Sequence, residues 1–209
     1  MSYPATRHLQ LTPWHNETAE IADPQVHNIV STSMIQDTSS PHETILLQII
    51  ANALPCCKYT RSKFAAMTIR MHNPRCTALL FTTGKLVVTG GNNWYECMLT
   101  AMHIATLINK VFYNKTYTAR GCDLQNIVAH TRLPIQGTAR LDIACMYRNM
   151  GLECTYQPSI FPGLSYRPIG SPVVILCFQS GNIVVTGAKE LHHIKVSAMC
   201  CLEILKLLK

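Results

Sequence analysis

Two pairs of phenylalanines in this sequence share one spacing. Phe64 and Phe81 are 17 residues apart, and Phe161 and Phe178 are also 17 residues apart. The phrase Asn-Ile-Val likewise stands at Asn28–Val30 and at Asn126–Val128, in corresponding places of the two halves of the chain. Aromatic rings can stack on flat apolar groups, and an asparagine amide can donate hydrogen bonds. A single strand phenylalanine usually belongs to a core, so it is the duplicated spacing that makes these rings candidates for contact with a partner.

Residues that could catalyse a reaction do not form a recognisable motif. The sequence has no Ser/His/Asp or Cys/His arrangement of known pattern, no glycine-rich phosphate loop follows a strand, and its 11 acidic residues are scattered. We therefore expect a binding protein that is not an enzyme and that needs no cofactor.

Ten cysteines could indicate disulfides or a metal site. The chain is long for a disulfide-stapled domain, its first residues do not resemble a signal peptide, and no Cys-x-x-Cys pair occurs. A metal site built from His192 or His193 with Cys200 or Cys201 stays open as an alternative. The simpler interpretation is thiols that act as small buried hydrophobes, with no metal bound.

The charge balance favours an anionic partner. The net charge is +7, from 18 basic and 11 acidic residues, while 48% of the chain is hydrophobic. Nucleic acid is one such partner, although many basic proteins bind none. No run of 18 apolar residues occurs, so we expect no membrane contact through a spanning helix.

An internal duplication sets the organisation of the chain. TGKLVVTG at Thr83–Gly90 returns as SGNIVVTG at Ser180–Gly187, 97 positions later. Several other fragments repeat in the same register, which chance does not produce. We predict a flexible N-terminal tail over 1–24 and two copies of one unit, over 25–113 and 114–209.

Apolar periodicity predicts the elements of each copy. Asn92 or Asn93 is expected to cap a long helix that ends near Val111. The expected strands are 28–32, 56–59, 64–71, 77–82 and 85–89, then 125–131, 152–157, 164–169, 173–179 and 182–188; the other expected helices are 42–52, 138–149 and 191–208. The predicted fold is α+β, with two pseudo-symmetric repeats. Each repeat is a five-stranded antiparallel sheet with two helices on one face, and the two sheets join into one curved sheet.

The face of the sheet away from the helices is also apolar. A sheet face in water normally carries polar residues. Either another part of this chain or a twin chain covers that face, which the pattern alone slightly favours, or the face is a binding surface.

The duplicated motifs resemble those of the TATA-box-binding protein family, over about Val26–Lys209. They are NIVST, KFAAMTIRMHNPRCTALLFTTGKLVVTGG, QNIV and YQPSIFPGLSYRPIGSPVVILCFQSGNIVVTGAK. The resemblance implies a saddle-shaped fold. It also implies a sequence-specific transcription initiation factor that binds and bends A·T-rich promoter DNA through the minor groove, as this family is known to do.

The resemblance also assigns roles to residues. Phe64 with Phe81, and Phe161 with Phe178, would wedge into base steps, while Asn28 and Asn126 would donate to acceptors at the centre of the site. Further matches are central threonines, an apolar floor, basic residues that meet phosphates, and the proline beside a wedge. These residues are Val30, Lys63, Arg70, Arg75, Leu79, Lys85, Val87, Thr89, Val128, Pro162, Arg167, Leu176, Val184 and Thr186.

Partners and location follow from the same resemblance. We expect double-stranded DNA on the open face, factors of the TFIIA and TFIIB type on the outer helical face, and RNA polymerase machinery reached through them. The expected location is the nucleus, or the transcription compartment of a virus if the chain is viral. An alternative function is a saddle-shaped protein-interaction module that regulates transcription with weak or no DNA binding.

Several residues depart from the family pattern. Asn182 replaces the usual lysine that matches Lys85, and Pro172 replaces an often basic residue, so copy two is expected to hold phosphates less firmly. YQPSI replaces YEPEL before Phe161, which removes acidic residues that help to dock TFIIB. The helix over Trp94–Lys110 is apolar on more than one face, which suggests a dedicated partner there.

Overall fold

The computed structural model describes residues 23–133, 140–150 and 153–206. Residues 1–22 of the predicted tail therefore lie outside the described ranges.

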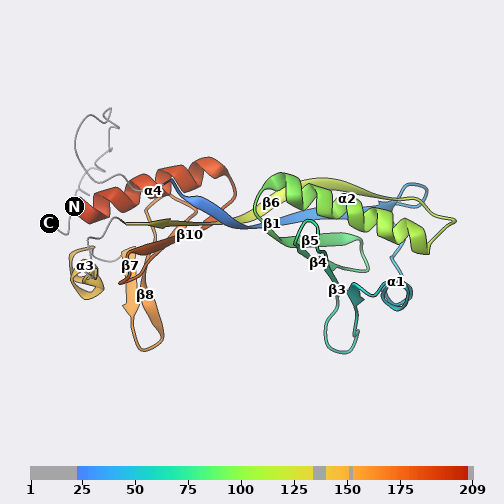
Figure 1. Ribbon diagram of the computed structural model, residues 1–209, viewed down its shortest axis with the longest axis horizontal. Coiled ribbons are helices and arrows are strands. Elements are labelled where there is room, and N and C mark those ends of the chain that lie inside the picture. Colours follow the sequence, from blue (N-terminus) through green and yellow to red (C-terminus); the bar gives the residue numbers. More distant parts are fainter. Residues whose placement is uncertain (1–22, 134–139, 151–152, 207–209) are drawn as a thin grey trace, which may run out of the picture.

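Ten strands form one sheet in the order β2-β3-β4-β5-β1-β6-β10-β9-β8-β7 (Figure 1). The strands are β1 (Gln25–Asp37), β2 (Cys57–Lys58), β3 (Met67–Arg70), β4 (Thr77–Leu80), β5 (Lys85–Gly91), β6 (Tyr117–Arg132), β7 (Cys154–Gln157), β8 (Phe161–Tyr166), β9 (Val174–Cys177) and β10 (Asn182–Ala188). All neighbours in the sheet pair antiparallel. The order is symmetric about β1 and β6, so each copy supplies five strands, as the sequence predicted.

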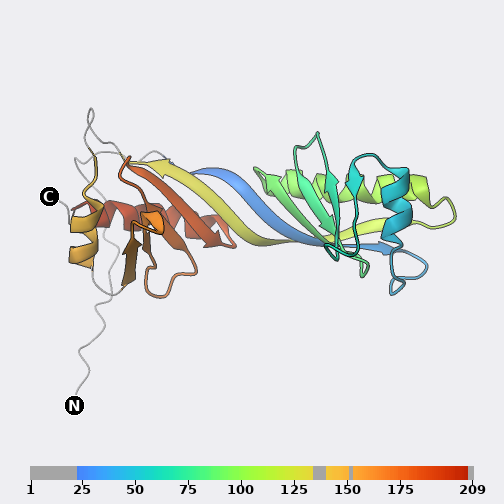
Figure 2. The same ribbon diagram turned by 90° about the horizontal axis from the view of Figure 1, so that it is seen from below.

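The helices give the sheet one covered face and one open face. They are α1 (Leu47–Ala53), α2 (Trp94–Val111), α3 (Ile143–Met150) and α4 (Leu191–Lys206). The long helices α2 and α4 lie along one face, while α1 and α3 lie toward the two ends (Figure 1). The outer strands bend away from α2 and α4 at both ends, so the opposite face is concave. Figure 2 shows the two long strands β1 and β6 running from one half of the molecule into the other.

Strand alternation separates the core from the concave face. The core side of the two hairpins is fully buried under α2 and α4, and it consists of Ala78, Leu80, Leu86, Val88, Ile175, Cys177, Ile183 and Val185. The residues between them are half-buried and also largely apolar. The sheet thus has a packed side and a second apolar side that no described element covers.

Some predicted boundaries were wrong. β1 runs to Asp37, because its whole length pairs with β6, and the Asp37 carboxylate accepts a hydrogen bond from the Thr116 backbone N–H at 3.1 Å. α1 begins later than expected, since the Ile45 N–H donates to the Thr82 carbonyl at 2.8 Å and this bond holds Ile45 outside the helix. Phe64 lies in the loop before β3, whereas a strand was predicted there.

The predicted cap of the long helix is confirmed for Asn93. Its side-chain oxygen accepts from the Glu96 backbone N–H at 2.9 Å, which satisfies one unpaired donor of the first turn. Such a cap contributes about 1 kcal/mol. Trp94 anchors the same end, because its indole N–H donates to the Cys122 carbonyl of β6 at 3.0 Å. Across the described ranges, no helix combines the length and hydropathy that crossing a membrane requires.

Candidate nucleic-acid interface

The concave face has an approximate two-fold axis between its central strands. Ile29 of β1 pairs with Ile127 of β6, and both side chains are buried on the helix side. On either side of this pair, Asn28 is opposite Val128 and Val30 is opposite Asn126. These four residues are half-buried and alternate with the core residues, so they lie on the concave face. The two predicted asparagines are therefore brought together at the centre of that face.

The asparagine amides are held in one orientation by the neighbouring strands. The Asn28 side-chain oxygen accepts from the Gly90 N–H at 2.8 Å and from the Thr89 hydroxyl at 3.3 Å. A backbone N–H can only donate, so the atom facing it must be the amide oxygen. This arrangement leaves the Asn28 NH₂ group as the donor available to a ligand.

The second copy repeats this arrangement. The Asn126 oxygen accepts from the Gly187 N–H at 2.7 Å and from the Thr186 hydroxyl at 3.4 Å. Its NH₂ group lies 3.3 Å from the Thr186 oxygen, which can take one of its two hydrogens. Thr89 and Thr186 thus position the predicted amides.

An apolar floor surrounds these amides. Val87 is opposite Leu79 in the first hairpin, and Val184 is opposite Leu176 in the second. All four are half-buried, in contrast to their fully buried neighbours on the core side. With Val30 and Val128 they form a continuous surface that offers contact but no hydrogen bond.

The two phenylalanine pairs predicted from their spacing do meet in space. The ring centroids of Phe64 and Phe81 are 6.5 Å apart, and those of Phe161 and Phe178 are 5.7 Å apart. Phe64 is 50% exposed and Phe161 is 40% exposed, which is unusual for large apolar rings. Each copy therefore presents one edge-to-face or tilted aromatic pair with an exposed member.

Gly163 fits closely beneath the second ring pair. A Cβ at this position would lie 2.7 Å from a Phe161 ring atom and 3.0 Å from a Phe178 ring atom. Gly163 was not among the site residues predicted from the sequence. The signal available was its place in β8 two residues after Phe161, where the first copy has Ala66.

The predicted basic residues are all exposed but sit on different parts of each copy. Arg70 ends β3 and Lys85 begins β5, whereas Lys63 and Arg75 lie in the loops on either side of β3. Arg167 follows β8, and its N–H bonds to the Glu153 carbonyl as that of Arg70 bonds to the Cys56 carbonyl (3.0 Å each). Within the described ranges, none of these five side chains forms an ion pair. Pro162, beside Phe161, is exposed.

Two histidines that were not predicted also belong to this face. The rings of His27 on β1 and His130 on β6 have centroids 4.5 Å apart. Partial burial, together with the charge of His27, lowers the pKa of His130 below its usual value. His130 follows Asn126 by four residues, so strand alternation could have placed it on this face.

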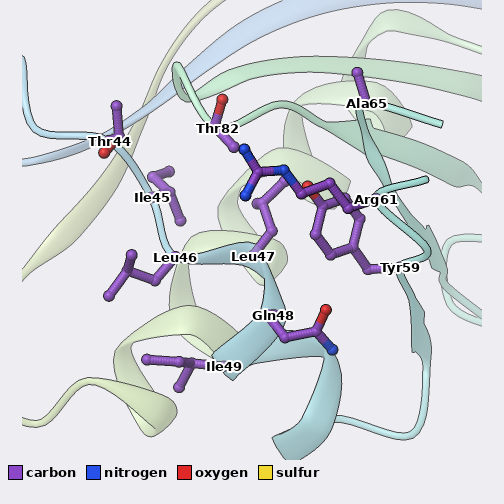
Figure 3. Close-up of a pocket in the computed structure, with 10 residues that line it drawn as sticks. All are labelled: Thr44, Ile45, Leu46, Leu47, Gln48, Ile49, Tyr59, Arg61, Ala65 and Thr82. Carbon is purple, nitrogen blue, oxygen red and sulfur yellow. The ribbon is translucent and has the colours of Figure 1, made fainter.

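Other features lie apart from the interface. A hollow of about 780 Å³ beside α1 is lined by residues that include Leu46, Ile49, Tyr59 and Arg61 (Figure 3). None of the predicted site residues lines it.

Burial raises the pKa of the Cys177 thiol to about 12, so this thiol stays protonated in the core.

The alternative metal site finds no support among the described residues. Where side chains are described, no group of three His, Cys, Asp or Glu residues could hold an ion. His192 instead contacts Glu190, with 3.0 Å between ring nitrogen and carboxylate oxygen. The Cys201 side chain lies outside the described residues.

Comparison with known proteins gives a consistent result. Residues 23–111 and 122–208 match the family described as transcription factor TFIID (or TATA-binding protein, TBP). The chain is 33% identical over 177 residues to TATA-box-binding protein-like 1 of Entamoeba histolytica (85% of this chain, 76% of the relative). It is 36% identical over 173 residues to the TATA-box-binding protein of Candida albicans (82% and 67%). The solved structure of Methanococcus jannaschii TBP superposes with a TM-score of 0.71 at 26% identity, covering 88% of this chain and 99% of the other.

Proposed function

Because the chain belongs to the TATA-binding protein family, we propose that it is a transcription initiation factor that binds A·T-rich promoter DNA. In this proposal the concave face takes the minor groove and bends the duplex. The description of the family names a transcription factor, so we propose no enzymatic activity. The nucleus is the proposed location.

The orientation of the two central amides carries this proposal. Asn28 and Asn126 each have the side-chain oxygen held by a backbone N–H, so their NH₂ groups are the groups left to contact a ligand. The minor groove at A·T pairs offers only acceptors, adenine N3 and thymine O2, whereas a G·C pair adds the guanine amino donor. Two fixed donors on an otherwise apolar floor fit the acceptors of A·T pairs. The same donors would face the guanine amino donor at a G·C pair, which is unfavourable.

The exposed aromatic pairs provide the bending. Phe64 and Phe161 would enter base steps at the two ends of the site, with Phe81 and Phe178 behind them. Unstacking a step costs a few kcal/mol, which a bent and widened groove returns as contact with the apolar floor. The exposed basic residues would meet phosphates and hold the bend.

The outer helical face is proposed to contact other transcription factors. On α2, Tyr95 is 59% exposed and Met102 is 52% exposed, while Leu99 between them is half-buried. This apolar stripe favours a partner that packs by hydrophobic contact on α2. A chain that stays monomeric without exposing apolar surface at α2, as measured by dye binding, would exclude this partner.

A gel shift on a TATA duplex, with a G·C-rich duplex as control, tests the central proposal. We expect preference for the TATA duplex and an affinity that falls steeply with salt, because phosphate contacts release counterions. End-to-end energy transfer should show bending that F161A and F64A each reduce. A flat salt dependence would argue against DNA binding, and an unchanged bend would remove the wedge role.

A protein-interaction module remains the second candidate function. It would keep the saddle and place a protein segment on the concave face, and the half-buried apolar floor could accept one. Equal affinity for both duplexes in the gel shift, with no bending, would favour this candidate.

A further inference from the structure

A basic residue absent from the second hairpin is replaced on the strand beside it. Counting six residues from the central asparagine of each copy gives Met34 in β1 and Arg132 in β6. The register pairs Met34 with Lys85 of β5, and it pairs Arg132 with Asn182 of β10. The same cross-strand pair therefore carries one cation in each copy, on the hairpin strand in the first and on the central strand in the second.

The side chain of Arg132 lies on the concave face. Its neighbours Thr131 and Leu133 are buried, and so is Ile183 beside Asn182, whereas Arg132 and Asn182 are exposed. Side chains alternate along β6, so Arg132 lies on the same face as Asn126, Val128 and His130. Among the described residues, neither of the ion pairs involves Arg132, so no carboxylate neutralises it there.

Both cross-strand pairs lie next to a phenylalanine wedge. The Phe81 N–H donates to the Lys85 carbonyl at 2.9 Å, and the Phe178 N–H donates to the Asn182 carbonyl at 3.0 Å. A shallow hollow at the second site is lined by residues that include His130, Phe178, Ser180 and Asn182. A cation in either pair is thus placed beside the aromatic ring at its end of the face.

We propose that Arg132 makes the DNA phosphate contact in copy two that Lys85 makes in copy one. This inference rests on the proposed DNA binding. The guanidinium group can grip a phosphate with two hydrogen bonds, whereas a lysine ammonium acts as a point charge. On this proposal, the absence of a lysine at position 182 does not weaken the phosphate contact of copy two, because Arg132 on the neighbouring strand supplies the positive charge.

The test compares salt slopes of affinity for a TATA duplex among charge-exchanged variants. The plot of log K against log salt has a negative slope, and R132M should make it less steep by about 0.9, which corresponds to the loss of one phosphate contact. Between about 50 and 200 mM salt it should therefore lose about 3.5-fold less affinity than the wild type loses. N182K should make the slope steeper by about the same amount, and the double variant R132M/N182K should have the wild-type slope.

A matched control removes the same charge from the opposite face. Lys195 is exposed on α4, so K195M changes the net charge equally without touching the concave face. A slope in R132M equal to that in K195M would overturn the role of Arg132, while a wild type that binds with no salt dependence would instead overturn the proposed function. Failure of the double variant to restore the slope would show that the two pair positions are not equivalent.

Discussion

Replacing Asn126 by aspartate isolates the donor role of the central amide. N126D keeps the shape of the side chain, and its carboxylate can still accept from the Gly187 N–H, now 2.7 Å from the amide oxygen. The Thr186 hydroxyl can donate to the other oxygen, in place of receiving a hydrogen from the NH₂ group. The fold should therefore keep its stability, since a backbone hydrogen bond to a charged acceptor is at least as strong.

The expected loss of DNA affinity follows from the groups that then face the groove. A lost donor removes about 1 kcal/mol, and an oxygen facing acceptors without a partner costs about 1–3 kcal/mol more. The sum of about 2–4 kcal/mol corresponds to a rise in Kd of about 30- to 700-fold. The two-fold arrangement predicts a similar loss for N28D, because the Asn28 oxygen is held by Gly90 in the same way.

Fluorescence anisotropy on a labelled TATA duplex at one fixed salt concentration measures this change. N114D is the matched control, because Asn114 is exposed in the turn after α2 and takes the same charge away from the concave face. A urea midpoint for each variant shows whether the fold is kept. If N126D binds as well as N114D, the amide is not a donor to DNA and the central argument for the function fails.

Two further predictions concern the ring pair and the histidine pair. G163A should reduce DNA bending measured by energy transfer, because its Cβ would lie 2.7 Å from Phe161 and displace a wedge; an unchanged bend would contradict this. Its stability cost should be at the low end of about 1–3 kcal/mol, since Phe161 is partly exposed and can move. For His130, the lowered folded pKa means that the unfolded chain binds more protons between that pKa and about 6.5. Stability should therefore fall as pH drops through this window, and a urea midpoint for H130Q should fall less.

The repeat made most of the fold predictable from sequence. Matched phrases aligned the copies, and alternation separated the residues of each hairpin into two sides. Both sides are apolar, as Leu86 and Val87 show, so it was the family resemblance that indicated which side is the open face. Strand length was harder to predict, because the second half of β1 contains the buried polar residues Ser31 and Ser33. This half is held in the sheet by pairing with β5 on one side and with β6 on the other. Sequence periodicity does not report such tertiary contacts.

Site residues divide along the same line. Asn28, Asn126 and the four phenylalanines could be found because each has a counterpart in the other copy. Arg132 and His130 could not be found in this way, because their counterparts Met34 and Thr32 are different in kind. Comparing the two copies finds residues that are the same in both. The strand register is needed to find Arg132, because its positive charge lies on a different strand from that of Lys85.

The differences between the copies gather away from the two-fold axis. Gln125 donates to the Thr32 hydroxyl at 2.9 Å, and the equivalent residues at the other end are the stacked His27 and His130. The central amides and the apolar floor are nearly symmetric, and the acceptors of an A·T minor groove are nearly the same for A·T and T·A pairs. On the proposed function, the centre can therefore select A·T pairs but cannot orient the protein on them. Any preferred orientation must come from the flanks, where one end has the hydrogen bond between Gln125 and Thr32 and the other has the stacked rings of His27 and His130.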